Sequence, residues 1–326
     1  MAYTRKSAVT TTKVSVYDIV TDRIISIMEK GIVPWNKPAH QIPATNLISK
    51  KVYKGVNTML LGFGAYSSPY WLSFKQAKDL GGYVNAGEKG HIAIFWTQFK
   101  KDKLDRAGQV VRDAKGNAVQ EVIPCMRYYT IFNSEQCTIP EGKVPQAPVR
   151  EVSTAINSVV ANYEDCPEIE FGNFDCGSYS DALDIIKMPV IENFTSIEDQ
   201  YATLFHELIH STRNSKRLNR KEAAETYKAQ YGREELVAEI GAAFLCYEAG
   251  IENTIPNQAA YIQNWIEVLQ GDKRLVVAAA SAAQKAAEYI LRNNAVIAPV
   301  VAPDAPAVIA DDVSDDTPEG DVYGLL

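Results

Sequence analysis

The sequence predicts an α+β protein of two domains, in which an α+β domain precedes a mainly helical domain that carries a small sheet. The length of 326 residues exceeds what one domain usually needs. Long strand-like runs are confined to the first part, and helical periodicity dominates the second. Between the two parts, "IPEGKVPQAPVRE" contains three prolines and no periodicity. We therefore expect domains over residues 15–138 and 152–297, joined by a linker over residues 139–151.

In the first domain, a helix should begin at Ser15, an N-cap with Asp18 three residues later, and should end at Gly31. "SPYWLSFKQAKDLGG" predicts a second short helix that the glycine pair closes. "HIAIFWTQF" and "PCMRYYTIFN" predict two strands. Residues 100–120 should form a long loop or hairpin between them.

In the second domain, a helix is expected near residues 152–163, followed by a turn and a strand in "FDCGSYSDALDIIKMP". The next helix should start after Thr195 and Ser196, each of which has an acidic residue three positions later. Further helical patterns cover residues 233–249 and 256–292. Residues 1–14 are expected to be a flexible arm. Residues 298–326, with seven acidic residues and no Lys or Arg, predict a disordered acidic tail.

The charge is distributed unevenly along the chain. Residues 1–140 contain 19 Lys and Arg against 10 Asp and Glu, a balance of +9, and the remainder contain 14 against 30, a balance of −16, which gives the net −7. The basic first part predicts a polyanionic partner. Five cysteines without a CxxC pair argue against a disulfide framework and against cysteine-ligated zinc. No apolar run has the length of a signal peptide or a membrane span, so we expect a cytoplasmic protein.

The stretch "LFHELIHSTRN" contains the pattern HExxH. On a helix, His206 and His210 lie on one face and can bind one Zn²⁺, while Glu207 can take a proton from a zinc-bound water. These are the only two histidines of the acidic part. Because short patterns recur by chance, the alternative is a solvated helix with incidental charges.

Catalytic zinc needs a third protein ligand and one open position. In "YGREELVAEIGAAFLCYEAG", Glu235 follows His210 after 24 residues, and Glu239 lies one turn further along a helix with an apolar stripe. We assign Glu235 as the third ligand and Glu239 as an acceptor that orients a ligand histidine. Glu234 and Glu239 are alternatives for the ligand, and a solvated acidic face is the alternative without metal.

Basic and aromatic residues alternate in the first domain, a mixture that suits single-stranded nucleic acid. Phe74, Phe95 and Trp96 lie in apolar settings and are expected to be buried, whereas Trp35 and Tyr53 are expected to be exposed. "GEKG" is either a turn that binds phosphate or a simple hairpin turn. The predicted nucleic-acid contacts are Trp35, Lys37, Lys51, Tyr53, Lys54, Asn57, Trp71, Lys75 and Lys89.

HExxH followed by a helix with Glu-x-x-x-acid resembles the gluzincin metallopeptidases. More specifically, residues 17–291 resemble the ArdC-like antirestriction proteins of plasmids and phages. The resemblance depends on "VTDRIISIMEKGIVPWNKP", "YKGVNTMLL", "SSPYWLSFKQAKDLGG", "GEKG", "IFW", "HELIHSTRN", "EELVAEIGAAFL" and "AAYIQNWIEVLQGDKR". It implies a single-stranded DNA-binding domain, a zincin-like metallopeptidase domain with Zn²⁺, and a bacterial host cell.

The resemblance implies an antirestriction protein, and two other functions stay open. One is a zinc metalloprotease that acts on a host or element-encoded protein and uses the basic domain for targeting. The other is a pure single-stranded DNA-binding protein with a vestigial zinc site. Tyr179, Tyr227 or Tyr231 could stabilise the oxyanion of a peptidase reaction. The strand within residues 182–189 is either the edge that pairs with a peptide substrate or a strand used only for packing.

Overall fold

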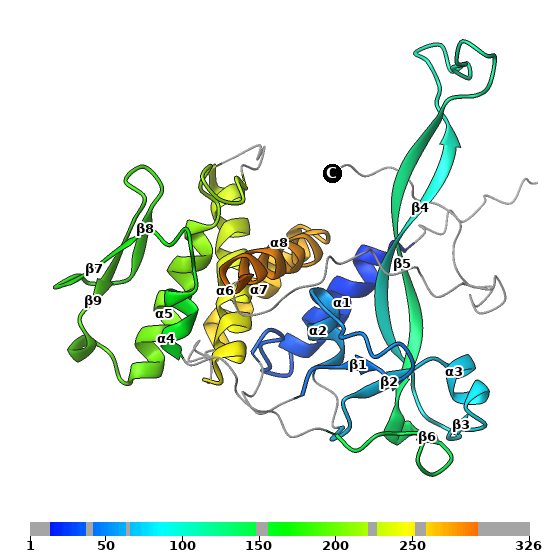
Figure 1. Cartoon of the computed structure of the whole chain (residues 1–326), viewed down its shortest axis with the longest axis horizontal. Coiled ribbons are helices and arrows are strands. Elements are labelled where there is room, and N and C mark those ends of the chain that lie inside the picture. The colour runs from blue at the N-terminus through cyan, green and yellow to red at the C-terminus, as the bar shows by residue number, and fades with distance from the viewer. Residues whose placement is uncertain are drawn as a thin grey trace, which may run out of the picture.

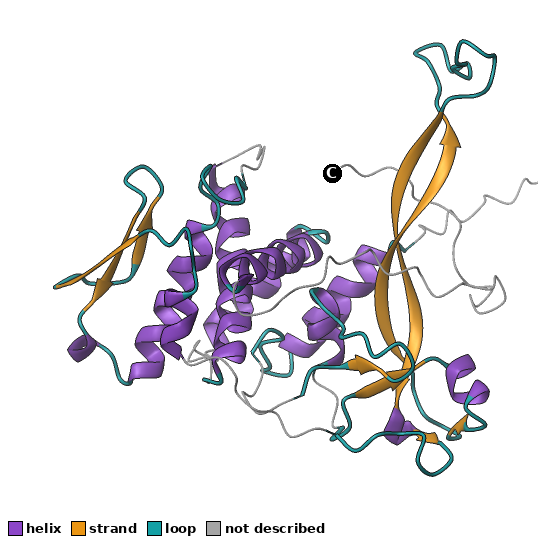
Figure 2. Cartoon of the chain, in the orientation of Figure 1, coloured by secondary structure: helices purple, strands orange, loops and turns teal. Residues whose placement is uncertain are grey.

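The computed structural model describes residues 14–36, 42–62, 66–147, 156–220, 227–251 and 259–292. The expected N-terminal arm up to residue 13, Lys37 and the expected acidic tail lie outside the described residues. Figures 1 and 2 show the arrangement of helices and strands. The elements of the first part are α1 (Val16–Met28), β1 (Thr45–Asn46), α2 (Val56–Leu61), β2 (Tyr70–Leu72), α3 (Phe74–Asp79), β3 (Tyr83–Val84), β4 (His91–Asp102), β5 (Gln120–Asn133), the 3-10 turn Ser134–Gln136 and β6 (Cys137–Thr138).

The second part contains one small sheet and most of the helical residues. Its elements are α4 (Ile156–Ala161), β7 (Glu168–Gly172), β8 (Ser178–Ser180), β9 (Ile185–Pro189), the 3-10 turn Ile191–Asn193, α5 (Ile197–Ser211), α6 (Tyr227–Ala249), α7 (Ala259–Gly271) and α8 (Leu275–Ile290). The predicted α+β architecture is therefore confirmed. All five cysteines are free.

Two helix starts follow from local capping, as the sequence indicates. The Ser15 hydroxyl accepts a hydrogen bond from the Asp18 N–H at 3.2 Å, and the Asp18 carboxylate accepts one from the Ser15 N–H at 3.0 Å. At the start of α5, the Ser196 hydroxyl accepts from the Asp199 N–H at 3.1 Å. These bonds satisfy N–H groups that have no partner within the helix.

Two helix predictions need correction. Residues 70–72 form strand β2, so the helix predicted in "SPYWLSFKQAKDLGG" covers only α3, which begins after the N-cap Ser73. The pattern over residues 256–292 is two helices, α7 and α8, with a break in which the Asp272 carboxylate accepts a hydrogen bond from the Arg274 N–H at 2.9 Å.

The first part is built on a four-stranded sheet in the order β1-β2-β5-β4. β4 and β5 form a long antiparallel ribbon whose register runs from His91 opposite Ile131 to Asp102 opposite Gln120. Its far end projects from the rest of the molecule (Figure 1). The Asn57 side chain fixes its base, because its amide donates to the Ile94 carbonyl at 2.9 Å and accepts from the Ile94 N–H at 2.8 Å.

The second sheet has the order β7-β9-β8, with β9 parallel to β7 and antiparallel to β8. β9 is the strand that the sequence offers either as a substrate edge or as a strand used only for packing. Because β9 lies between β7 and β8, it is not an edge, and the structure agrees with the packing alternative. The free edge near α5 belongs to β8. The sequence underweights β8 because it is only three residues long.

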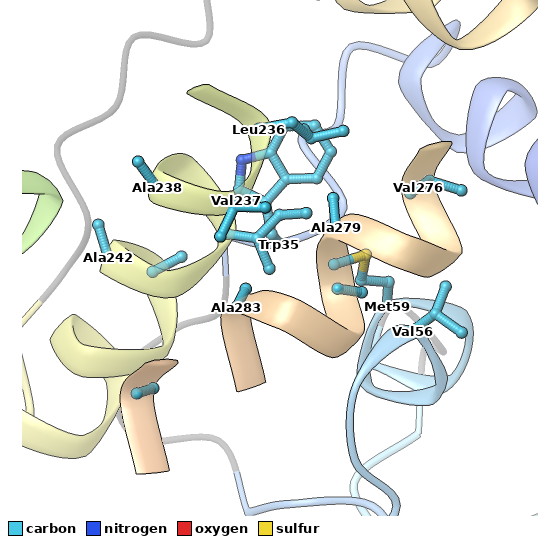
Figure 3. Packing of buried hydrophobic residues seen from close by; sticks show 14 of the residues in the cluster. Trp35, Val56, Met59, Leu236, Val237, Ala238, Ala242, Val276, Ala279 and Ala283 are labelled. Carbon is cyan, nitrogen blue, oxygen red and sulfur yellow. The ribbon is translucent and has the colours of Figure 1, made fainter. Parts of the chain in front are cut away.

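The two parts share one hydrophobic core. α8 packs against α6 and also against α1 and α2 of the first part. In Figure 3, Trp35, Val56 and Met59 from the first part meet side chains of α6 and α8. The facing side of α8 is rich in buried alanine, which lets neighbouring helices approach closely. Polar contacts also join the two parts. The Thr21 hydroxyl donates to the Lys273 carbonyl at 2.6 Å, and Lys54 forms an ion pair with Glu288 at 2.7 Å.

Within the described ranges, no helix has both the length and the apolar character needed to cross a membrane.

Candidate metal centre

Helix α5 presents His206 and His210 of the HExxH pattern on the side that faces α6. The residues of α5 around the two histidines are apolar and almost completely buried, namely Leu204, Phe205, Leu208 and Ile209. The His206 and His210 side chains keep 21% and 12% of their surface exposed. The packing therefore fixes the helix rotation and leaves both imidazoles at the edge of the core, where an ion and water can reach them.

Gly241 brings α6 close to α5. A Cβ at this position would lie 2.7 Å from Ile209 Cδ1, so only glycine fits without movement of the isoleucine. Gly241 lies on the same helix as Glu235, about six residues further along the chain. The sequence analysis gives Gly241 no role, although a glycine inside a strongly helical pattern is a signal of close packing.

The three predicted ligands come together. His206 Nε2 and His210 Nε2 are 3.0 Å apart, and the Glu235 carboxylate lies 3.5 Å from the first and 3.4 Å from the second. One potential ligand atom from each residue falls within 4.8 Å of the others. Among the described residues, this is the one group of three or more His, Cys, Asp or Glu side chains with that geometry.

Glu234, not Glu239, contacts the second nitrogen of His210. Glu234 Oε1 lies 3.4 Å from His210 Nδ1 and accepts a hydrogen bond from Arg220 Nη2 at 2.6 Å. Arg220 also donates to the Ile209 carbonyl at 3.2 Å. A carboxylate on Nδ1 keeps the proton there and leaves the Nε2 lone pair for a metal. At His210 the carboxylate in the orienting position is therefore that of Glu234, and an orienting role for Glu239 stays a prediction.

Glu239 is partly buried beside this group. Burial raises the pKa of its carboxyl, and the nearby His206 imidazole opposes that change. Its Oε2 atom is buried and has no hydrogen-bond partner in the described part of the chain. A buried carboxylate oxygen without a hydrogen-bond donor is costly unless a positive charge compensates it. A divalent cation on the three ligands would supply that charge, so the residues present fit a metal ion.

Glu207 is buried on the other side of His206. Burial raises the pKa of its carboxyl, while both imidazoles and the Tyr179 backbone N–H lower it. Gly177, the residue before β8, lies close to this side chain, because a Cβ at Gly177 would lie 3.4 Å from Glu207 Cγ and 2.7 Å from the Thr203 methyl carbon. A carboxyl whose pKa is raised toward neutrality suits proton transfer near neutral pH.

The Tyr179 hydroxyl is hydrogen-bonded to side chains other than the three ligands. It donates to Asp184 Oδ1 at 2.9 Å and accepts from Asn214 Nδ2 at 3.2 Å. Asp184 also binds Arg217 at 2.7 Å and Lys216 at 2.9 Å. This network ties the β8–β9 turn to the end of α5, so Tyr179 has a structural role and not the oxyanion role considered for it. The side chains of Tyr227 and Tyr231 lie outside the described residues.

The three aromatic residues predicted to bind DNA are all buried. Trp35, Tyr53 and Trp71 retain 1%, 8% and 2% of their surface, so the exposure expected of Trp35 and Tyr53 is wrong. Trp35 packs edge-on against Trp265 of α7, Trp71 packs against Tyr66 and His91, and the Tyr53 hydroxyl lies 3.4 Å from that of Tyr129. None of the three can stack on a base in this conformation.

The reverse error concerns aromatic residues that were expected to be buried. Phe74 is 57% exposed and Trp96 is 55% exposed, whereas Phe95 is half-buried against Tyr129. Apolar sequence neighbours misled the prediction, because side chains in β4 alternate between the two faces of the ribbon and Phe74 is an exposed residue at the start of α3.

The polar residues predicted to bind DNA have mixed positions. Lys51, Lys54 and Lys89 are exposed, Lys75 is half-buried, and Lys54 is engaged with Glu288. Asn57 holds the β4 backbone. In "GEKG", Gly87 has φ +87° and Gly90 lies against Thr130 and Phe132 of β5. This turn therefore has a structural explanation, since it directs the chain into β4.

Two family models match the two parts of the chain. The N-terminal domain of the anti-restriction factor ArdC matches residues 14–132, and the zincin-like metallopeptidase model matches residues 167–282. A zincin-like domain implies a divalent metal.

Similar proteins extend both matches. Two DNA primases TraC of Escherichia coli are 33% and 32% identical over 84% of this chain, but the chain spans only 20% and 27% of their lengths. The uncharacterized protein y4eC of Sinorhizobium fredii is 28% identical over 86% of this chain and 92% of its own.

Crystal structures of the antirestriction ArdC protein from plasmid R388 resemble the whole described fold. The metal-free form has a TM-score of 0.66 and 32% identity, over 86% of this chain and 98% of that one. The Mn(II)-bound form has the same TM-score and identity, over 87% and 100%. With this identity across nearly all of the plasmid protein, and with both domain models matched in order, the chain belongs to the ArdC antirestriction family.

Proposed function

We propose that this protein binds single-stranded DNA through its basic first part and hydrolyses a peptide bond at the His206–His210–Glu235 site, in the cytoplasm of a bacterial host. The observation that carries the peptidase proposal is the convergence of the three ligand atoms within 4.8 Å, with the buried Glu207 carboxyl beside them. The DNA proposal is supported by the +9 balance of residues 1–140 and by the ArdC-type N-terminal domain.

A divalent ion bound at this site supplies a Lewis acid that acidifies water and polarises a carbonyl. His206, His210 and Glu235 would hold this ion, and Glu234 would keep the His210 proton on Nδ1. Glu207 takes the proton from the attacking water and passes it to the leaving amine, as a carboxyl with a raised pKa can do. The free edge of β8 binds the substrate backbone in an extended form next to Glu207.

We propose Zn²⁺ as the resident metal. Two imidazoles and one carboxylate form the His₂Glu set of catalytic zinc sites, which leaves one position for water. Mn(II) occupies the R388 protein in one of its structures. Zinc binds such nitrogen-containing sites more tightly than manganese in the general order of divalent ions. Metal analysis of protein purified without added metal should therefore give about one zinc per chain, and a manganese content above the zinc content would contradict this assignment.

The substitution Glu207→Gln tests the peptidase proposal. The amide has nearly the same shape but cannot accept a proton near neutral pH, so metal content and fold should be unchanged. Hydrolysis of a casein or peptide-library substrate should fall by about 10² or more, the usual scale for loss of a general base. Wild-type protein that is loaded with zinc and cleaves none of these peptides would count against peptidase function.

The same variant tests how antirestriction arises. If protection depends on coating of DNA, Glu207→Gln should protect incoming DNA as well as the wild type does, because the site lies on another part of the chain. We expect this outcome, since bound protein blocks a nuclease without any second target. A variant with normal zinc and normal DNA binding that no longer protects would show that cleavage of a protein is required.

A further inference from the structure

The far half of the β4–β5 ribbon lies away from the core of the molecule. At its base, Ala93 and Ile94 are buried and the Asn57 clamp holds the strand. The far half of the ribbon extends from the body (Figure 2), and its turn is closed by its own backbone and by Asp105 and Asp113. Between Trp96 and Arg127 only Met126 is buried, so the projecting half adds little to the core and consists mainly of surface.

One face of this half combines an aromatic ring with a cation. Trp96 pairs with Met126, Gln98 with Pro124 and Lys100 with Val122 in the antiparallel register, so the side chains of these pairs lie on the same face. Trp96 is 55% exposed and Val122 is 52% exposed. The other three tryptophans of the chain are at most 5% exposed. Trp96 is therefore the only tryptophan positioned to contact a partner.

The projecting half is also basic. From Trp96 to Arg127 the sequence contains seven Lys and Arg against four Asp and Glu, and 7 − 4 gives +3. Two of the four carboxylates are occupied by turn N–H groups, since Asp105 accepts from Ala107 and Gln109, and Asp113 accepts from Lys115 and Asn117. Lys100, Lys103 and Arg106 are exposed. The field near this ribbon therefore favours a polyanion.

We propose that the face of the ribbon with Trp96 and Lys100 is the surface on which single-stranded DNA binds, with an unpaired base stacked on the Trp96 indole and a neighbouring phosphate at Lys100. This inference rests on the proposed DNA binding and locates the binding surface on the β4–β5 ribbon. Four residues along a strand span roughly 13 Å, which is about the reach of two nucleotides in an extended strand. The exposed indole favours single strands, because a base within a duplex offers it no free face.

The first experiment measures affinity of the full chain for a fluorescein-labelled oligothymidine. Trp96→Ala should weaken binding about 5- to 100-fold, the range for loss of one stacked base. Lys100→Ala should reduce the slope of log affinity against log salt by about 0.7, the value for one phosphate contact on single strands. Phe74→Ala is the matched control, since Phe74 is an equally exposed ring on α3, and it should bind like the wild type.

The second experiment uses tryptophan fluorescence. DNA should quench the emission of the wild type, because Trp96 is the only exposed indole. Trp96→Phe should retain affinity within a few-fold but lose the quenching. If the wild type binds DNA while Trp96→Ala binds equally well, the ribbon proposal is overturned and the proposed DNA binding stands. If the wild type binds no oligonucleotide, the proposed DNA binding itself fails. If duplex DNA binds as tightly as the single strand, stacking on Trp96 is excluded.

Discussion

His210 illustrates how single residues determine the metal site. One ring nitrogen faces His206 and Glu235, and the other faces Glu234, which Arg220 holds in place. Two adjacent glutamates of α6 therefore contact the two nitrogens of this ring: Glu235 lies at the nitrogen that would bind the metal, and Glu234 lies at the nitrogen that carries the proton. Adjacent residues on a helix point about 100° apart, so Glu234 and Glu235 can reach different sides of one imidazole.

This arrangement predicts the effect of Glu234→Gln. The amide can no longer fix the His210 proton as a carboxylate does, and metal affinity should fall 10- to 100-fold, as is usual for a partner of a ligand histidine. Competition with a chromogenic chelator measures the change. Glu248→Gln, an exposed position on the same helix, should leave the affinity unchanged. Equal affinity of Glu234→Gln and the wild type would exclude an orienting role for Glu234.

Asp184 gives a pH-dependent prediction. Burial alone would raise the pKa of this carboxyl, but hydrogen bonds from Arg217, Lys216 and Tyr179 lower it to about 2, from an ordinary value of 3.8. A pKa that is lower in the folded state stabilises the fold above the unfolded value, and that stabilisation is lost as the pH falls from about 4 to 2. In urea unfolding, Asp184→Asn should be less stable than the wild type at pH 7. The difference in free energy of unfolding between the two proteins should become smaller below pH 4. A difference that does not change with pH would refute the prediction.

At the scale of elements, the distance between α5 and α6 determines whether Glu235 reaches the histidines. Gly241→Ala should force Ile209 to move and should destabilise the fold by about 1–3 kcal/mol, the usual cost of overpacking. It should also weaken metal binding. Gly232→Ala on the same helix is the control, because a Cβ there meets nothing within 4 Å. That change should be neutral or slightly stabilising, since alanine favours a helix. Calorimetry with and without metal distinguishes the two variants.

Elements that depend on residues close together in the chain could be predicted from the sequence, whereas those that depend on distant residues could not. The starts of α1 and α5 depend on contacts three residues apart, and the pattern His206–Glu207–His210 repeats at one helical turn, so both were predictable from the sequence. The burial of Trp35 depends on Trp265, which is 230 positions away, and the burial of Trp71 depends on His91 across the sheet. Such contacts leave no local periodicity. The exposure of Trp96 was missed because its neighbours are apolar while the ribbon itself leaves the core.

At the scale of the whole molecule, α7 and α8 connect the two parts. Because they contribute to the core beside α1 and α2, metal binding at α5 and α6 should stabilise the first part as well. With free zinc at 100 times its dissociation constant, the gain should be about 2.7 kcal/mol. Hydrogen exchange of the α1 amides should slow when zinc is added. The His206→Ala variant, which lacks a ligand, should show no such change. Protection confined to α5 and α6 would indicate that the two parts unfold independently.

The shared core also has an evolutionary consequence. A recombination that exchanged residues 15–138 alone would replace one side of a packed interface, in which Trp35, Val56 and Met59 fit against α6 and α8 (Figure 3). The hybrid would carry cavities and clashes that natural selection removes. Both parts should therefore be inherited together, as one cassette. The TraC primases match this chain over 84% of its length within much longer proteins, which is the pattern expected when such a cassette is inserted whole.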